Sequence, residues 1–495
     1  MDPLILAIDA GTTGITVLVV NGAGEPVARA YQELPQIFPR PGWVEHDPLQ
    51  IWDAVTRAVA RAAAQVDRRA VQAIGITNQR ETTVLWERKT LRPVANAIVW
   101  QDRRSAGICS ELKEAGLQDQ VRSATGLVLD PYFCGSKLTW LMRQQPELRR
   151  RSEAGELAFG TVDSWLVAKL TGGTVHATDV TNACRTLLFN ISTMSWDPAL
   201  LELFGVAESL LPEVRPCCTR FGMADEQLLG FAVPIAGIAG DQQAALFGQA
   251  CFEPGMSKNT YGTGSFVMTN TGSERSISKH GLLTTVALQM DEKVTYALEG
   301  TIFITGAAVS WLRDGLGIIG SAAETEPLAL TVPDSGGTYF VPSMVGLAAP
   351  HWDPDARGAI TGISRGTTKG HVARATVEAM AFQTRDVVDA MVADSGISIA
   401  EIRVDGGASV MDLLCQFQAD LLGVPVARPT NTETTAMGAA YLAGITAGVW
   451  AGTDEVSERW KLDRRFEPSH RSEEMADRYR GWLKAVESVR TTRPL

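Results

Sequence analysis

The hydrophobic and polar pattern at the start of the chain predicts two strands joined by a tight turn. Residues 4–8 are apolar, residues 9–14 are rich in turn-forming types, and residues 16–20 are apolar and β-branched again. A helix is expected from Asp47-Pro48, where an N-capping residue precedes a proline and apolar residues then recur at helical spacing. Two more strand-like segments follow, at 71–77 and 82–87. This alternation is typical of an α/β protein.

The second half of the chain repeats this opening pattern. Residues 257–261 favour a strand, a Gly-Thr-Gly turn follows, and residues 266–269 favour another strand. A strand at 295–298 then precedes a helical stretch at 307–316, and a charged helix is expected from Glu473 onward. Because no long linker separates the halves, we expect a duplicated α/β unit with a cleft between two closely packed domains.

Size and charge narrow the classes of function. The 495 residues correspond to about two to four domains. With 45 basic and 56 acidic residues the net charge is −11, so the chain has no global basic field for nucleic acid or anionic lipid. The best membrane-spanning candidate, Thr434–Thr453, is rich in Gly, Ala and Thr, and we expect it to form a tightly packed interior helix instead. Seven cysteines without a Cys-x-x-Cys pair fit a reduced, cytoplasmic enzyme.

Two turns rich in glycine and hydroxyl residues are candidates for phosphate binding. The segment Asp9–Gly14 places a carboxylate at a strand end, followed by a tight turn whose N–H groups can face an anion. Taken alone, this segment is more typical of a plain β-hairpin turn. The similar segment Tyr261–Ser265 in the second half favours the phosphate interpretation, because two such turns could hold a polyphosphate from both sides.

Asp241 and Gln242 place an acid and an amide at the head of a predicted helix. Asp241 is equally typical of a helix N-cap. A carboxylate near a metal and a substrate hydroxyl can also accept the proton as oxygen attacks phosphorus, which is the general-base role in phosphoryl transfer. Both interpretations can hold at once.

Arg80 and Glu81 follow a predicted strand, where an ordinary solvated ion pair is the simpler interpretation. A guanidinium that donates beside a carboxylate that accepts can also bind the hydroxyls of a polyol. Trp100, Tyr132 and Phe266 are either core aromatics or a wall that shields the carbon face of such a small ligand.

Long segments in a fixed order carry a resemblance to a known family. These are PGWVEHDP at 41–48, GITNQRETT at 75–83, TGLVLDPYF at 125–133, FGTVDSWL at 159–166, GIAGDQQAALFGQ at 237–249, KNTYGTG at 258–264 and VDGGA at 404–408. The chain thereby resembles the FGGY carbohydrate kinase family, and within it the members that phosphorylate glycerol. The resemblance implies the actin-like ATPase fold: two ribonuclease-H-like domains, residues 1–248 with the polyol pocket and 249–495 with the nucleotide site, closing on Mg-ATP and glycerol.

The same resemblance implies roles for individual residues. The implied glycerol contacts are Arg80, Glu81, Tyr132, Asp241 and Gln242, with Trp100 and Phe266 as the apolar wall. Asp241 is the implied base, and Asp9 and Asp241 would hold Mg²⁺ largely through water. The implied nucleotide contacts are Thr12, Thr13, Gly14, Thr263, Gly306, Ser310, Gly407 and Met411. In-line attack by the 3-hydroxyl of glycerol on ATP would give sn-glycerol 3-phosphate and ADP.

Four positions in the nucleotide half depart from the family pattern. Where the family usually has Gln, Arg, Gln and Asn, this chain has Ala10, Thr16, Ser310 and Met411. Loss of an arginine near phosphates removes a donor worth about 1.5–3 kcal/mol, so these positions bear on nucleotide affinity.

Two other functions compete with phosphorylation of glycerol. One is a kinase for another short polyol or sugar. The other is a non-catalytic polyol sensor, against which Asp9 and Asp241 argue, because a sensor needs neither carboxylate. As partners we expect glycerol, ATP and ADP, no nucleic acid and no integral membrane segment, with assembly into a homodimer or homotetramer.

Overall fold

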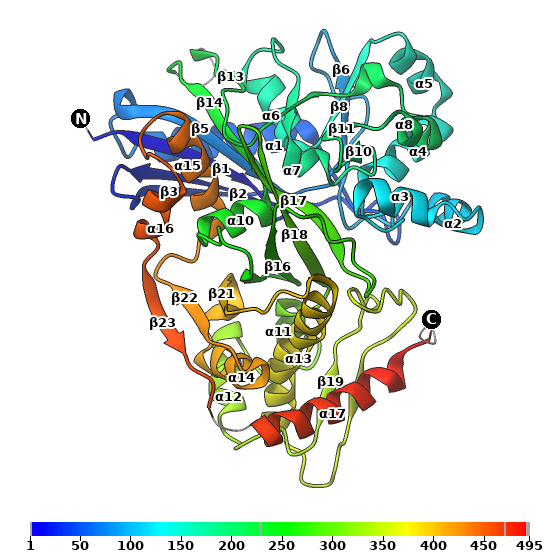
Figure 1. The fold of residues 1–495 in the computed structure, drawn as a ribbon, viewed down its shortest axis with the longest axis vertical. Helices are drawn as coiled ribbons and strands as arrows, with labels where there is room; N and C mark the ends of the chain where they lie inside the picture. Colours follow the sequence, from blue (N-terminus) through cyan, green and yellow to red (C-terminus); the bar gives the residue numbers. More distant parts are fainter. Residues whose placement is uncertain (1, 227–229, 470–471, 492–495) are drawn as a thin grey trace.

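The computed structural model describes residues 2–226, 230–469 and 472–491. Each half of the chain is built on one large sheet, and the two sheets form the centres of an upper and a lower lobe (Figure 1). The strands of the first sheet are β1 (Leu4–Ala10), β2 (Gly14–Asn21), β3 (Pro26–Glu33), β5 (Val71–Asn78), β13 (Gly222–Met223) and β14 (Pro234–Gly240). Those of the second are β15 (Met256–Tyr261), β16 (Ser265–Gly272), β17 (Leu283–Met290), β18 (Lys293–Ile302), β21 (Glu401–Asp405), β22 (Val426–Pro429) and β23 (Leu462–Phe466).

The two sheets share one topology. In the first, β3, β2 and β1 pair antiparallel, and β5 and β14 then follow β1 in parallel. In the second, β18, β16 and β15 pair antiparallel, and β21 and β22 then follow β15 in parallel. The duplication predicted from the repeated strand–turn–strand pattern is therefore confirmed, as is the α/β fold of two ribonuclease-H-like units.

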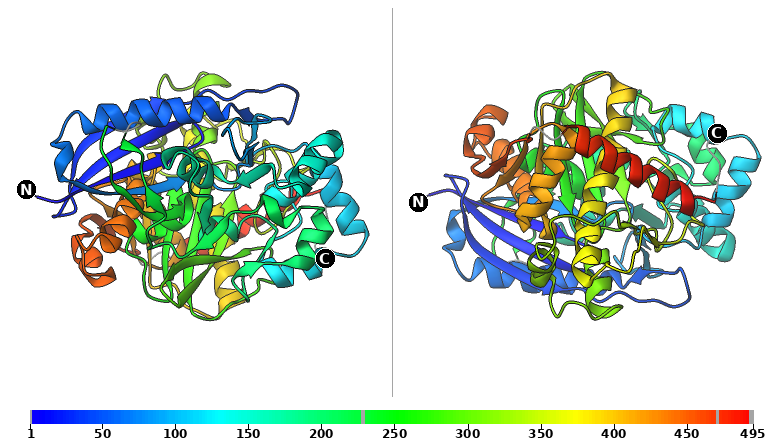
Figure 2. Two further views of the ribbon diagram at one scale, coloured as in Figure 1. Left: turned by 90° about the horizontal axis from the view of Figure 1, so that it is seen from above. Right: turned by 90° about the horizontal axis from the view of Figure 1, so that it is seen from below.

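Helices cover both faces of the first sheet. Alternate residues of β1 pack into two different cores: Leu6 and Ile8 lie in the core shared with α1 (Pro48–Ala63), whereas Ile5 and Ala7 lie in the core shared with α15 (Thr434–Thr446). Seen from above, α1 runs along the outer face of this sheet (Figure 2). Burial on both faces explains why the strands β1 and β2 are nearly continuous apolar runs in the sequence.

The helix α15 confirms the interior helix predicted within residues 434–453. Although it lies between β22 and β23 of the second sheet in sequence, it packs on the first: a Cβ on Gly75 would lie 2.1 Å from the Ala439 carbonyl oxygen, and one on Gly237 would lie 2.4 Å from the Ala443 nitrogen. Glycines in β5 and β14 therefore let the helix approach the strands directly. Within the described ranges, no helix combines the length and apolarity that a bilayer crossing needs.

Most local predictions agree with the observed boundaries. The Asp47 side chain caps α1 by accepting from the Leu49 N–H, with Pro48 in the first helical turn. The predicted strand at 82–87 is too long, because β6 spans Val84–Glu87. Thr82 instead belongs to a tight turn, its N–H donating to the Arg80 carbonyl oxygen at 2.7 Å.

The remaining helices surround the sheets. In the first half these are α2 (Ala106–Glu114), α3 (Gln118–Thr125), α4 (Cys134–Gln144), α5 (Pro146–Glu153), α6 (Val162–Leu170), α7 (Val180–Ala183), α8 (Pro198–Phe204) and α10 (Asp241–Gly248). In the second they are α11 (Gly306–Asp314), α12 (Thr325–Ala329), α13 (Lys369–Ser395), α14 (Asp412–Leu422), α16 (Thr453–Arg459) and α17 (Ser472–Val489). The apolar side predicted for the last helix is confirmed, since Trp482 and Val486 are buried in the lower core.

Candidate active site

Three parallel strands of the first sheet bring the predicted acidic and basic residues to one edge. Asp9 lies near the end of β1, Arg80 follows the end of β5, and Asp241 follows the end of β14 directly. The carboxyl ends of neighbouring parallel strands meet at the same edge, where open α/β sheets bind their ligands. The sheet topology thus assembles residues that lie up to 232 positions apart in the sequence.

Arg80 lies at the centre of a buried ionic cluster. Its Nε is 3.1 Å from Asp241 Oδ1 and 3.8 Å from Glu81 Oε1, and the side chains of Arg80 and Glu81 are each 1% exposed. The interpretation of Arg80 and Glu81 as a solvated surface pair is therefore wrong. Donors and acceptors held this close, and away from water, form a suitable surface for the hydroxyls of a polyol.

Asp241 is the first residue of α10 rather than its N-cap. The N-cap is Gly240, and Asp241 Oδ1 accepts from the Gln242 N–H at 2.8 Å. The N-cap interpretation is therefore wrong. Burial raises the pKa of Asp241, while Arg80 and Lys258 lower it. A carboxyl group whose proton affinity is raised, and which stays 29% exposed, can take up a proton from a bound hydroxyl.

The three predicted aromatic residues form one wall. The ring centroid of Trp100 lies 5.7 Å from that of Tyr132 and 6.2 Å from that of Phe266, both in edge-to-face arrangements. Phe266 comes from β16 of the second sheet, so the wall spans the two halves. Trp100 Nε1 donates to Thr12 Oγ1 at 2.9 Å, which connects the wall to the first phosphate turn.

The first predicted phosphate turn is closed by a hydrogen bond from the Gly11 N–H to the Gly14 carbonyl oxygen at 3.1 Å. The Thr13 carbonyl oxygen accepts from the hydroxyl of Tyr31 at 3.2 Å. Asp9 lies beside this turn, where burial and the negative charges of Asp241 and Glu433 raise its pKa to about 8. A hard divalent cation such as Mg²⁺ would offset the negative charge around Asp9, and Asp9 and Asp241 remain the residues expected to supply oxygen ligands to it.

The second predicted phosphate turn lies at the end of β15 and contacts two other candidate segments. The Thr263 carbonyl oxygen accepts from the backbone of Thr305 and Ala307 at 3.0 Å each, at the start of α11. A Cβ on Gly306 would lie 2.5 Å from the Gly262 carbonyl oxygen, so glycine is needed for this contact. Gly406, which precedes the candidate Gly407, has φ 83° and lies against the Tyr261 backbone.

The two remaining nucleotide candidates differ in exposure. Ser310 is exposed on α11, one turn after Gly306. Met411 precedes α14 and is 7% exposed, packed into the core of the lower lobe. The structure therefore brings Thr263, Gly306 and Gly407 to one edge of the second sheet, with Ser310 nearby, whereas the side chain of Met411 faces the core.

Four polar residues in or beside the polyol cluster were missed in the sequence. They are Arg185, Gln243, Lys258 and Glu299. Lys258 Nζ donates to the Gln242 side-chain oxygen, and burial lowers the pKa of Lys258 to about 8. The available signal was a charged residue inside an otherwise apolar strand, as with Glu299 in the run from Tyr296 to Ile302. Such a residue needs a buried partner, but the sequence does not show which one.

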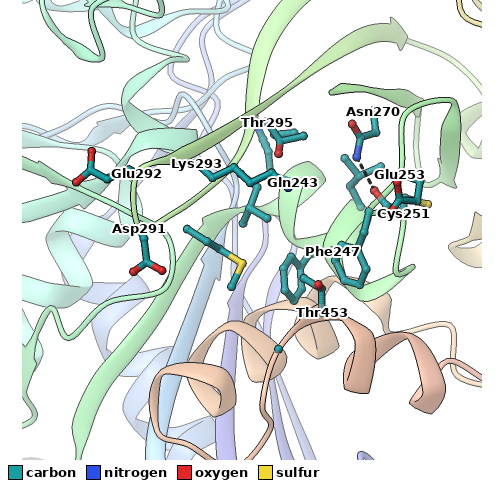
Figure 3. A pocket seen from close by; sticks show the side chains of 16 residues that line it. Gln243, Phe247, Cys251, Glu253, Asn270, Asp291, Glu292, Lys293, Thr295 and Thr453 are labelled. Atoms are coloured by element: carbon teal, nitrogen blue, oxygen red, sulfur yellow. Dashed lines mark hydrogen bonds between the residues drawn. The ribbon is translucent and has the colours of Figure 1, made fainter. Parts of the chain in front are cut away.

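A pocket of about 530 Å³ is lined in part by Gln243 (Figure 3). Leu246 and Phe247 of α10 line it together with Phe252 and Lys293, and Thr453 borders it. None of the predicted site residues lines this pocket. Gln243 connects the two places, because it lines this pocket and also accepts from Arg80 Nη1 at 3.1 Å.

Comparison with known proteins gives the family. The N-terminal domain of the FGGY family of carbohydrate kinases matches residues 4–248, and its C-terminal domain matches residues 257–447. The chain belongs to this family. Glycerol kinase 2 of Thermotoga maritima is 54% identical over 484 residues, covering 97% of this chain and 98% of the relative. The glycerol kinase of Chromobacterium violaceum is 54% identical over 491 residues, covering 99% and 98%.

Solved structures of this FGGY fold agree with the observed architecture. The structure of Plasmodium falciparum glycerol kinase with ADP superimposes with a TM-score of 0.92 at 34% identity, covering 100% of this chain and 99% of that one. Gluconate kinase from Lactobacillus acidophilus superimposes with a TM-score of 0.89 at 23% identity, covering 99% and 98%. The second likeness shows that the fold is shared with kinases of other substrates.

Proposed function

We propose that the protein is an ATP-dependent glycerol kinase that forms sn-glycerol 3-phosphate and ADP. The carrying observation is that all seven residues expected to contact glycerol gather in one site, in a chain 54% identical to glycerol kinases over nearly its whole length. These residues are Arg80, Glu81, Trp100, Tyr132, Asp241, Gln242 and Phe266.

In this proposal the polyol lies against the aromatic wall with its hydroxyls on the ionic cluster. Arg80 donates to polyol oxygens, while Glu81 and Asp241 accept from polyol hydroxyls. Gln242 is held by Lys258 through its side-chain oxygen, which leaves its amide N–H groups to donate. The wall of Trp100, Tyr132 and Phe266 covers the carbon face and excludes water.

Phosphoryl transfer then follows from the position of Asp241. The carboxylate of Asp241 accepts the proton of the 3-hydroxyl as that oxygen bonds to the γ-phosphorus of ATP, and the bond from this phosphorus to the bridging oxygen breaks to release ADP. Arg80 beside Asp241 opposes the rise in pKa that burial causes, which favours the carboxylate form that accepts the proton. Asp9 and Asp241 would hold Mg²⁺, which would supply positive charge to offset that of the phosphates.

The nucleotide is placed between the two turns. Thr12, Thr13 and Gly14 face it from the first sheet, and Thr263 from the second. Gly306, Ser310, Gly407 and Met411 are proposed on the nucleotide side of the lower lobe. The hydrogen bonds that close both turns, together with the contact of Gly306 on Gly262, support this arrangement.

Three further proposals concern the whole protein. We propose a division into domains 1–248 and 249–495, supported by one large sheet in each part and by family matches at 4–248 and 257–447. We propose a cytoplasmic location, supported by seven unpaired cysteines. We also propose a homodimer or homotetramer, which gel filtration with light scattering would test.

The proposed activity is tested by incubating the purified protein with Mg-ATP and a panel of glycerol, other short polyols and sugars, and measuring ADP release. Glycerol is expected to give the highest kcat/KM. A higher kcat/KM for another polyol or sugar would instead identify a kinase with a different substrate. Binding of a polyol without ADP release would indicate a sensor and would overturn the proposal.

A further inference from the structure

Glu299 is a buried carboxylate that lies on the second sheet and contacts residues of the upper lobe. It lies on β18, two residues before the position that pairs with Phe266 on β16, and its side chain is 0% exposed. Figure 1 shows β17 and β18 reaching from the lower lobe toward the upper one. A buried charge is tolerated when it is paired and hydrogen-bonded, so the partners of Glu299 define what it does.

Those partners are two arginines of the polyol cluster. Arg80 donates to Glu299 through Nη1 at 2.6 Å and through Nη2 at 2.9 Å, a two-pronged contact. Arg185 donates through Nη2 at 3.0 Å, and its Nε donates to Glu81 Oε1 at 2.6 Å. Burial raises the pKa of Glu299, but Arg185 and Arg80 outweigh it and lower the pKa to about 2. Glu299 is therefore ionised and fixes both guanidinium groups.

Glu299 leaves one edge of Arg80 unused. A guanidinium has five N–H bonds in a rigid plane. Glu299 and Gln243 take three of them, since Nη1 also donates to Gln243 Oε1 at 3.1 Å. The Nε atom is buried and lies 3.1 Å from Asp241 Oδ1, but it forms no hydrogen bond with a described residue, and Arg185 Nη1 forms none either. Buried donors without a partner are costly, and the hydroxyl oxygens of a bound polyol would satisfy them.

We propose that Glu299 is a positioning residue for the polyol: it holds Arg80 and Arg185 so that their N–H groups that lack a hydrogen bond face the polyol hydroxyls. This inference rests on the proposed kinase function. Because Arg80 and Arg185 belong to the upper lobe and Glu299 to the lower, the polyol site is complete only when the two lobes are packed together.

The test compares Glu299→Gln with the wild type in steady-state kinetics, with direct glycerol binding by calorimetry and with thermal unfolding. Glutamine keeps the shape but offers one acceptor oxygen, and its amide N–H groups face a guanidinium that can only donate. We expect the KM for glycerol and its Kd to rise about tenfold or more, with the KM for ATP changed less than about twofold. Glu299→Asp, which keeps the charge on a shorter side chain, should show a smaller rise and serves if the glutamine variant is insoluble.

Glu378→Gln is the matched control. Glu378 lies on α13, is also buried, and is also shared by two arginines, Arg374 at 2.8 Å and Arg478 at 3.0 Å. The Glu378→Gln variant should lower the Tm about as much as Glu299→Gln does, while leaving the KM for glycerol and the KM for ATP unchanged. If Glu299→Gln lowers only the Tm, or raises both KM values equally, Glu299 is merely structural. If the wild type shows no polyol-dependent ADP release, the proposed function itself fails, and this inference fails with it.

Discussion

Glu81 adopts a left-handed backbone conformation, with φ 59°, that residues other than glycine seldom adopt. In a regular strand, Arg80 and Glu81 would point to opposite faces. The tight turn at Glu81 instead lets both side chains reach the same buried cluster. Such a conformation costs about 1–3 kcal/mol and persists where neighbours hold it. Here the Glu81 carbonyl oxygen is held by Lys137 Nζ at 2.9 Å.

Asp241→Asn is expected to bind glycerol but not to turn over. The amide keeps the shape of the carboxylate and loses its ability to accept a proton, and loss of a general base costs about 10²–10⁴ in rate. The measurements are kcat from ADP release and the Kd for glycerol from calorimetry. Turnover close to that of the wild type would exclude Asp241 as the base.

The sequence predicts some site residues and misses others for a physical reason. Arg80, Glu81 and Asp241 are recognisable because each follows a strand in a short polar motif that resembles a family pattern. Arg185 and Glu299 lie 114 positions apart, and each is the only charged residue in its stretch of the sequence. Their pairing follows from how the two lobes pack, and spacing along the chain carries no information about that contact.

At the scale of single elements, the β1–β2 pair decides what surrounds Asp9. Thr16 on β2 pairs directly with Asp9 on β1 and with Tyr31 on β3. Residues directly opposite in an antiparallel pair share a face. Thr16, at the position where the family usually has an arginine, thus lies beside Asp9, whose pKa is raised. Both residues lie next to the turn that we propose contacts the phosphates.

Thr16→Arg is therefore expected to lower the KM for ATP. The guanidinium would pair with Asp9 and donate to phosphate oxygens, and a charge-assisted contact of this kind would lower the KM by about three- to tenfold. Steady-state kinetics at saturating glycerol measures the change, and Thr16→Gln, which adds length without charge, is the control. An unchanged or higher KM in Thr16→Arg would show that Tyr31 or another group already fills this space.

The C-terminal helix α17 docks on α13 partly through the buried carboxyl group of Asp386. Asp386 on α13 accepts from the hydroxyl of Tyr479 at 2.7 Å and from Trp482 Nε1 at 2.8 Å. Burial raises the pKa of Asp386 from 3.8 to about 7, although both hydrogen bonds lower it. The folded protein thus binds a proton here at pH values where the unfolded chain has released it, so stability from this site falls as pH rises toward 7.

Asp386→Asn should remove this pH dependence. Between about pH 5 and pH 8, the free energy of unfolding of the wild type is expected to fall by about 1–3 kcal/mol relative to that of the asparagine variant. Denaturant unfolding of both proteins across this range gives the difference. Parallel curves for the two proteins would show that Asp386 keeps an ordinary pKa.

Helices and strands can be predicted from the sequence where the local pattern is strong, but the elements that they pack against cannot. The capped start of α1 and the interior character of α15 follow from residue types alone. That α15 covers the first sheet, rather than the sheet whose strands flank it in sequence, depends on glycines at 75 and 237 that contact it across the fold. A glycine within a strand indicates that another part of the chain packs closely against the strand, but it does not indicate which element that is.

At the scale of the whole molecule, the two lobes meet where α10 crosses α15. Each helix follows the last parallel strand of its ribonuclease-H-like unit, and the contact is reciprocal. A Cβ on Gly248 of α10 would lie 2.0 Å from the Thr434 carbonyl oxygen, and one on Gly438 of α15 would lie 1.9 Å from that of Ala244. Because α10 begins at Asp241, this crossing also sets the position of the proposed base.

Gly438→Ala should therefore separate the two helices and disturb catalysis from a distance. The added methyl group meets backbone, which cannot rotate away, so we expect a loss of about 1–3 kcal/mol in the free energy of unfolding. A displaced α10 should also lower kcat by about tenfold or more, since small errors in position are costly in phosphoryl transfer.

Gly107→Ala in α2 is the matched control, because nothing lies within 4 Å of its added Cβ. There alanine should be neutral or stabilise the helix by up to about 1 kcal/mol. If the two variants have equal free energies of unfolding and equal kcat, then α10 and α15 accommodate the added methyl group without moving Asp241.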